Sequence, residues 1–194
     1  PVSRRLGLDG KFVVMYSGTI SISSSAALER ALDAAALLEG DREIVFAVVG
    51  EGLKKDSLGR KAAALNLRNT VFLPFVPYPE LPALLATSDV LLVPLDRDKS
   101  DLSVPSKLYT FMAAGRPVRG LASPDSEVAA LLRENDSGLA AAPDDPAAIA
   151  DAVRALKGSP ERRRARGAHA RDSVVRHFDK DTALRAYDML LKSV

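Results

Sequence analysis

The sequence predicts an α/β fold with a parallel sheet of about six strands, helices on both faces and further helices at the C-terminus. Short runs that are apolar throughout alternate with longer segments whose apolar residues recur at helical spacing. Strands without a polar face must be covered on both sides, which is typical of parallel sheets packed between helices. The length of 194 residues, with 47% hydrophobic and 27% charged residues, suits one such folded domain.

Six segments are expected to form the strands of this sheet. The first covers residues 12–17 and stops at Gly18, and the second covers residues 44–49 and runs into a Gly-Glu-Gly turn at 50–52. The four shorter strands are expected at residues 70–73, at 90–93, from 117 onward and at 137–140.

Helices are expected between and after these strands. A serine from the cluster at 21–25 is expected to cap the first helix, in which apolar residues recur from Leu28 to Leu38 and which Gly40 ends. A later helix is expected at 105–114, with Pro105 in its first turn. The other helices are predicted at residues 53–65, 81–86, 127–134, 146–156, 160–177 and 181–192. Ligands of such sheets bind beyond the carboxyl ends of the strands, so we expect the functional site in the loops there.

Charge and composition argue against several classes of function. Lysine and arginine total 27 against 25 acidic residues, a net charge of +2, whereas a nucleic-acid-binding domain is expected to be strongly basic. The absence of cysteine excludes disulfides, thiol catalysis and thiolate metal sites, and fits a reducing, cytoplasmic location. No apolar run is long enough to cross a bilayer. The chain begins at Pro1 without a methionine, so we expect it to be a piece of a longer protein.

A basic run lies on one of the C-terminal helices. Arginines occupy positions 162, 163, 164 and 166. A solvated helix face is the favoured interpretation, because charged residues on helices usually face water. The alternative is contact with an anionic membrane surface, which would place the full-length protein peripherally at the inner face of the membrane.

Glycines follow the first two strands and offer a first candidate site. Gly18-Thr19 ends the first strand, and Gly50 and Gly52 follow the second. Glycine permits both a tight turn and close approach of a ligand to the backbone. Both interpretations remain open for Gly18, and a tight turn is favoured for Gly50 and Gly52. No G-x-G-x-x-G fingerprint and no phosphate-binding P-loop motif follow any strand, which disfavours a nicotinamide-dependent dehydrogenase.

A second candidate is the start of the helix at 105–114. Ser106 and Lys107 are expected in its first turn, where free amides, a hydroxyl and an ammonium group would together bind an anion. A cation in a first turn is otherwise unfavourable, so Lys107 indicates a bound anion. The alternative, a lysine that points into water, is equally compatible with the sequence.

No set of residues has the spacing of a metal site, and we expect neither a metal nor a cofactor. Asp96, Asp98 and Asp101 share one loop after a strand, but a solvated loop is their favoured interpretation.

Several motifs together resemble a known family. The segments are 6–18 (LGLDGKFVVMYSG), 46–52 (FAVVGEG), 71–77 (VFLPFVP) and, as the most specific, 104–118 (VPSKLYTFMAAGRPV). In them the chain resembles the C-terminal domain of bacterial group 1 glycosyl transferases, nearly from end to end. These enzymes have two Rossmann-like domains, the GT-B architecture, and segment 104–118 is similar to the variant in enzymes that build bacterial surface polysaccharides.

The resemblance implies a function for residues 1–194 as a single nucleotide-sugar-binding domain. In the family the C-terminal domain binds the donor, usually a UDP- or GDP-sugar, and the N-terminal domain, absent from this chain, binds the acceptor. Transfer typically retains the anomeric configuration and needs no metal. The fragment alone is therefore expected to be inactive. The family's last helix often crosses back to the N-terminal domain, and here Leu184, Tyr187, Leu190 and Leu191 form one apolar stripe.

The family motifs also assign residues. Gly18 matches the glycine near the diphosphate, and Ser106 and Lys107 match the helix start that faces it. Val76 and Pro77 match the loop beside the base.

Two features of the family pattern are absent. The arginine and lysine usual after the first-strand glycine are replaced by Thr19 and serines, which leaves Thr19 as the candidate beside the diphosphate. The two glutamates usual near the sugar and the ribose are replaced by Leu102 and Thr110, of which only Thr110 can offer a hydroxyl to the nucleoside. The alternative function is therefore a catalytically silent nucleotide-binding or scaffold module with the same fold.

Overall fold

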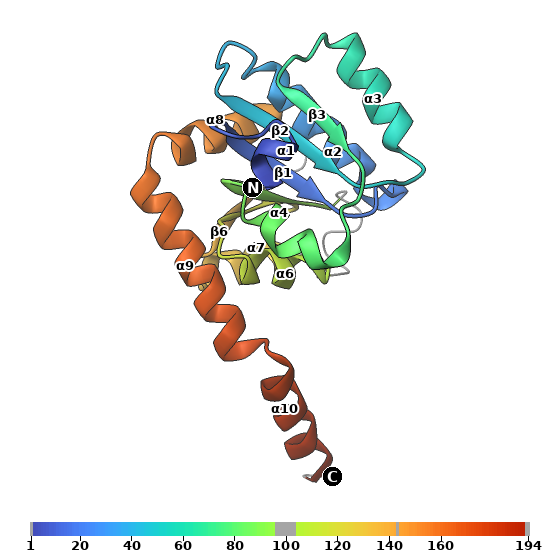
Figure 1. The fold of residues 1–194 in the computed structure, drawn as a ribbon. Helices are drawn as coiled ribbons and strands as arrows, with labels where there is room; N and C mark the ends of the chain where they lie inside the picture. Colours follow the sequence, from blue (N-terminus) through green and yellow to red (C-terminus); the bar gives the residue numbers. More distant parts are fainter. Residues whose placement is uncertain (1, 96–103, 143, 193–194) are drawn as a thin grey trace.

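The computed structural model of the chain describes residues 2–95, 104–142 and 144–192. Its strands form one parallel sheet, as predicted (Figure 1). The strands are β1 (Phe12–Ser17), β2 (Ile44–Val49), β3 (Thr70–Leu73), β4 (Val90–Pro94), β5 (Val118–Leu121) and β6 (Gly138–Ala141). The first three match their expected bounds, β4 is one residue longer, and β5 and β6 begin one residue later than expected.

The strand order creates a crevice at the carboxyl edge of the sheet. The order is β3-β2-β1-β4-β5-β6, so the chain leaves β1 toward one edge and returns through β4 toward the other. Both β2 and β4 pair in parallel with β1, through Met15 with Ala47 and Met15 with Leu91. Because the connections after β1 and β4 diverge, the space between them is where sheets of this order bind ligands.

Helices cover both faces of the sheet, as the apolar strands require (Figure 1). The described helices are α1 (Val2–Arg5), α2 (Ile22–Ala36), α3 (Lys55–Ala64), η1 (Tyr78–Glu80), α4 (Leu81–Leu85), α6 (Lys107–Ala113), α7 (Glu127–Glu134), α8 (Pro146–Lys157), α9 (Pro160–His177) and α10 (Lys180–Lys192). One core contains α2, α3 and α8, and the other contains α4, α6, α7 and part of α9. Alternation along β1 sends Val14 to the first core and Met15 to the second. The sequence patterns did not predict α1 and η1.

The ends of α2 differ from the prediction. Ser21 occupies the N-cap position, but its side chain makes no capping hydrogen bond. The Ser24 and Ser25 hydroxyls instead donate to backbone carbonyls three residues earlier. The helix ends at Ala36 rather than at Gly40, since the next residues form tighter i→i+3 bonds such as Leu38 N–H to the Ala35 carbonyl, 3.0 Å.

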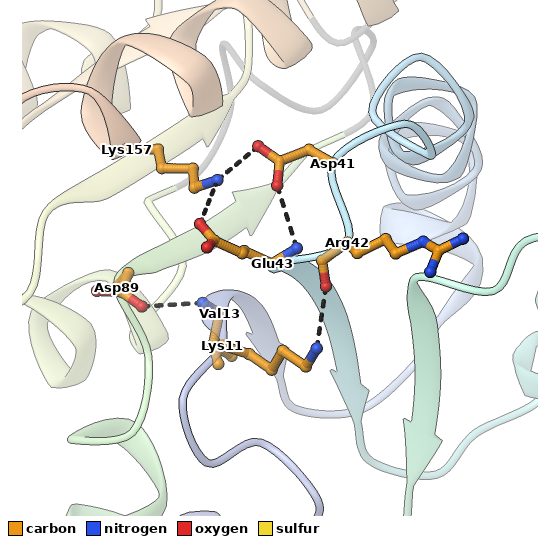
Figure 2. Close-up of polar contacts among 7 residues, drawn as sticks. All are labelled: Lys11, Val13, Asp41, Arg42, Glu43, Asp89 and Lys157. Atoms are coloured by element: carbon orange, nitrogen blue, oxygen red, sulfur yellow. Dashed lines mark hydrogen bonds and ion pairs between the residues drawn. The ribbon is translucent and has the colours of Figure 1, made fainter.

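Ion pairs and hydrogen bonds hold the amino end of the sheet together (Figure 2). Lys157 on α8 pairs with Asp41 at 2.5 Å and with Glu43 at 2.8 Å, which ties this helix to the turn before β2. The Asp89 carboxylate accepts a hydrogen bond from the Val13 amide at 2.9 Å, which ties the start of β4 to β1. These contacts lie at the opposite end of the strands from the crevice, so they support the sheet without occupying the ligand-binding edge.

The basic run on α9 is not a uniformly solvated face, and that prediction is wrong for two of its arginines. Arg163 pairs with Asp89 at 3.2 Å and lies over the Phe12 ring, 5.1 Å from its centroid. Arg166 is mostly buried beside Asp136, 3.7 Å away. The helix lies against the domain, so residues three apart turn inward, whereas Arg162 and Arg164 remain exposed.

The C-terminal helix α10 extends away from the sheet domain (Figure 1). None of its described residues is buried within the chain. Its apolar stripe is exposed, with fractions of 55% for Leu184, 67% for Tyr187, 60% for Leu190 and 75% for Leu191. No helix among the described residues combines the length and apolarity needed to cross a membrane.

Candidate functional site

A cavity of about 350 Å³ opens among the predicted loops, beyond the carboxyl end of β1 and between the segment after β3 and the start of α6. It is lined by Ser17, Gly18, Phe75, Val76, Tyr78, Leu81, Ser106, Lys107, Thr110 and Phe111. Five of the seven candidate residues, from segments far apart in the sequence, therefore line this cavity. The other two, Thr19 and Pro77, are neighbours of lining residues but do not line the cavity themselves.

The turn after β1 is packed backbone against backbone. Gly18 has φ +148° and Gly50 has φ +146°, conformations that favour glycine. A Cβ on Gly50 would lie 2.0 Å from the Gly18 carbonyl oxygen, and a Cβ on Gly52 would lie 2.3 Å from the Ile20 carbonyl oxygen. The favoured interpretation of Gly50 and Gly52 as close-turn glycines is consistent with this packing. Gly18 differs, because its Cβ position faces the Lys107 ammonium at 2.9 Å.

The helix start at 105–107 differs from the prediction in its first residues. Regular helix begins at Lys107, Ser106 is the N-cap without a side-chain capping bond, and Pro105 precedes the helix instead of lying in its first turn. The reason is a tight i→i+3 bond, from the Leu108 amide to the Pro105 carbonyl at 2.9 Å, which comes before the first α-helical bond. Ser106 and Lys107 nevertheless both face the cavity.

Lys107 does not point freely into water. Its ammonium donates a hydrogen bond to the Tyr16 hydroxyl at 2.8 Å and lies 4.4 Å from the centroid of the Tyr16 ring. Burial lowers the pKa of Lys107 to about 8. Among the described residues that line the cavity none is acidic, so none of them raises the pKa of the lysine again. A partly desolvated cation without an acidic neighbour attracts an anionic ligand.

Several residues of the cavity lining are apolar or aromatic. Phe75, Val76, Tyr78 and Leu81 come from the segment after β3, and Phe111 comes from α6. Phe75 and Tyr78 are 50% and 85% exposed, so their rings are accessible to a ligand. The cavity thus combines a cation and hydroxyls with apolar and aromatic surface, which suits a ligand with an anionic group and a flat ring.

Sequence reasoning missed the aromatic residues of this site. Tyr16 lies in segment 6–18 and Phe75 in segment 71–77, but neither was assigned a role, and Tyr78 lies outside the segments that resemble the family. Exposed aromatic residues beside the Val76-Pro77 loop were an available signal, because large exposed apolar side chains often mark a binding site. Nothing in the local sequence indicated that the Tyr16 hydroxyl would meet a lysine 91 positions later.

The remaining candidates lie elsewhere or outside the described residues. Asp96, Asp98, Asp101 and Leu102 fall in the segment that the structure does not describe. In the described part, no three His, Cys, Asp or Glu side chains gather as a metal site would require. Arg119 on β5 is another buried cation, 6% exposed, and burial lowers its pKa to about 10, but it does not line the cavity.

Comparisons with known proteins agree with this architecture. WcaI of Escherichia coli (strain K12), named as a colanic acid biosynthesis glycosyl transferase, is 33% identical over 181 residues, which are 92% of this chain and 42% of WcaI. The GDP-mannose-dependent alpha-(1-6)-phosphatidylinositol dimannoside mannosyltransferase of Mycobacterium tuberculosis (strain ATCC 25177 / H37Ra) is 32% identical over 165 residues, 84% of this chain and 40% of that protein.

A solved structure shares the fold over the whole chain. HepE of Anabaena, crystallised in complex with UDP-glucose, superposes with a TM-score of 0.83 at 18% identity, covering 100% of this chain and 52% of HepE. The chain therefore spans roughly half the length of the proteins it matches, and it has the fold of one Rossmann-like domain of the GT-B architecture. The family model described as "Glycosyl transferases group 1" matches residues 11–158, more than half of the sequence, and the chain belongs to this family of glycosyl transferases.

Proposed function

We propose that the cavity beyond β1 is the nucleotide-sugar donor site of a group 1 glycosyltransferase. The observation that carries this proposal is the position of Lys107, a partly buried ammonium at the switch point with no acidic residue among the described lining residues. The HepE complex with UDP-glucose supports a donor of this class. The colanic acid role in the name of WcaI supports bacterial surface polysaccharide synthesis as the process.

In this proposal the diphosphate lies between Gly18 and the start of α6. Lys107 contributes a charge and Ser106 a hydroxyl, and glycine at position 18 lets the phosphate approach the backbone. The Thr19 backbone adjoins this turn. The base lies against Phe75 and Val76, beside Pro77, and Thr110 reaches the ribose with its hydroxyl.

The chemical role of Lys107 is to stabilise the departing nucleoside diphosphate. Negative charge on the diphosphate grows as the bond to the sugar breaks, and a fixed cation in a partly desolvated site stabilises that charge. Transfer then proceeds without a protein-bound metal. The acceptor is held by an N-terminal domain outside this chain, so these 194 residues alone transfer no sugar. Turnover by the chain above a no-enzyme blank would contradict the two-domain proposal.

The exposed stripe on α10 is the proposed contact with that N-terminal domain. An apolar helix face that is more than half exposed among the described residues is stabilised by burial against a partner. Leu184→Glu combined with Tyr187→Glu should lower the melting temperature of the full-length protein and leave that of the 194-residue chain unchanged. Equal effects on both proteins would contradict the contact.

A catalytically silent module is the second candidate function. It is favoured by Leu102 and Thr110, which occupy the positions of the two family glutamates. Such a module would retain nucleotide affinity in this cavity, and its full-length form would transfer no sugar from any donor. Nucleotide binding by the chain followed by turnover assays on the full-length protein therefore separates the two functions.

Calorimetric titration of the chain with UDP, GDP and NAD⁺ tests the donor site. We expect a nucleoside diphosphate to bind and NAD⁺ not to bind. Lys107→Ala should lower the affinity for the nucleoside diphosphate by about tenfold or more, because a hydrogen bond to a charged group contributes ~1.5–3 kcal/mol. Lys192→Ala, on an exposed part of α10, is the matched control and should bind as wild type does. Wild-type affinity in Lys107→Ala would place the diphosphate elsewhere.

A further inference from the structure

Tyr16 joins the two segments that place Gly18 and the Lys107 ammonium on the cavity wall. It lies at the penultimate position of β1 and is 0% exposed. Its hydroxyl donates a hydrogen bond to the Thr19 carbonyl at 2.6 Å and accepts one from the Lys107 ammonium at 2.8 Å. One phenol therefore contacts both the turn after β1 and the first residue of α6.

We propose that Tyr16 is a positioning residue for the donor site, whose hydroxyl and ring hold the Lys107 ammonium against the turn at Gly18. This inference rests on the proposed function, because it assumes that the lysine binds the diphosphate. Tyr16 itself lies beneath the wall and does not line the cavity. It acts through Lys107 rather than on the substrate.

The geometry restricts the lysine in three directions. The hydroxyl fixes one of its three N–H groups, the ring lies 4.4 Å from the Nζ atom, and Gly18 lies beside the ammonium, since a Cβ added there would lie 2.9 Å from Nζ. Lysine is among the side chains that lose most rotamer freedom on ordering. A lysine that is already ordered loses less of this freedom when the anion binds, and two N–H groups remain for the ligand.

A purely structural role is the competing explanation for the same contacts. In this explanation the bond from the Tyr16 hydroxyl to the Thr19 carbonyl shapes the turn after β1, and the contact between Tyr16 and Lys107 has no effect on ligand binding. The two explanations differ in one respect. A positioning role exists only while Lys107 is present, whereas a role in the turn persists without it.

A double-mutant cycle on UDP affinity, measured by calorimetry on the 194-residue chain, separates them. Tyr16→Phe keeps the ring but removes the hydroxyl, so the Lys107 side chain regains rotamer freedom in the unbound chain. Because this freedom is lost again when UDP binds, the affinity should fall about threefold to tenfold. In a Lys107→Ala background the same change should have no further effect. Tyr109→Phe, whose ring packs on Phe178 on the outer side of α6, is the matched control and should bind as wild type.

The outcomes distinguish failure of the inference from failure of the donor site. Unchanged affinity in Lys107→Ala overturns the donor site itself. Two other outcomes overturn only the positioning role. In the first, Lys107→Ala weakens UDP binding but Tyr16→Phe does not. In the second, Tyr16→Phe weakens UDP binding by the same factor in the wild-type and the Lys107→Ala backgrounds. If Tyr16→Phe does not fold, NMR of the wild-type chain tests the proposal instead. We expect the Lys107 ammonium signal, assigned by its loss in Lys107→Ala, to show an ordered side chain protected from solvent exchange. A Lys107 signal averaged by free rotation of the side chain overturns the proposal.

Discussion

The affinity of the cavity for a nucleoside diphosphate is expected to fall as the pH rises from 7 to 9. Burial lowers the pKa of Lys107 to about 8, so the free protein loses this proton within that range. A bound diphosphate stabilises the charged lysine and keeps the proton in place. The charged fraction in the free protein falls from about nine tenths at pH 7 to about one tenth at pH 9, so the affinity should fall about tenfold.

The other groups around the lysine do not produce this change. Burial raises the pKa of Tyr16, so its hydroxyl stays protonated and adds no negative charge to the site between pH 7 and pH 9. Tyr78 is the one further titratable side chain among the described lining residues, and none of these residues carries a carboxylate. The direction follows from the depressed pKa: binding takes up a proton when the pH lies above about 8 and takes up almost none well below it.

Isothermal titration with UDP at pH 7 and pH 9, in buffers of different ionisation enthalpy, measures the affinity and the proton uptake together. Lys107→Ala is the reference variant. UDP contributes any titration of its uracil ring equally to both proteins, whereas only the wild type has the Lys107 ammonium. Its affinity should be low and nearly independent of pH. A wild-type affinity that varies in parallel with that of Lys107→Ala, without proton uptake at pH 9, would refute the link between this lysine and the diphosphate.

The structure makes three further predictions. Gly50→Ala should lower the free energy of unfolding by about 2 kcal/mol or more in chemical denaturation, since its Cβ would lie 2.0 Å from the Gly18 carbonyl. Gly59→Ala is the control, since its Cβ meets nothing within 4 Å on α3, and it should be neutral or stabilising. Arg119→Met should raise the melting temperature, because it removes a buried cation whose Nε has no hydrogen-bond partner among the described residues; a clear decrease would contradict this. Nucleotide affinity should be unchanged by a chelator, and its loss on chelation would contradict the metal-free site.

The sequence by itself determined the sheet and the edge at which its candidate site residues lie. Runs such as Ile44–Val49 are apolar throughout, and only a strand covered on both faces accommodates such a run. Alternation of strands with helices then requires parallel pairing, and parallel strands bring their carboxyl ends to one edge. The local motifs at Gly18 and at Ser106-Lys107 follow two such strands, so their place at this edge could be predicted from the residues alone.

Tertiary structure decided what these residues contact. The bond between Tyr16 and Lys107 joins positions 91 residues apart, and the strand order that makes β1 and β4 neighbours is not encoded in either local segment. The inward turn of Arg163 and Arg166 likewise depends on how α9 lies against the domain, because local charge does not show which face a helix buries. Burial also sets the lowered pKa of Lys107, since desolvation depends on the atoms that surround the ammonium and not on its neighbours in the chain.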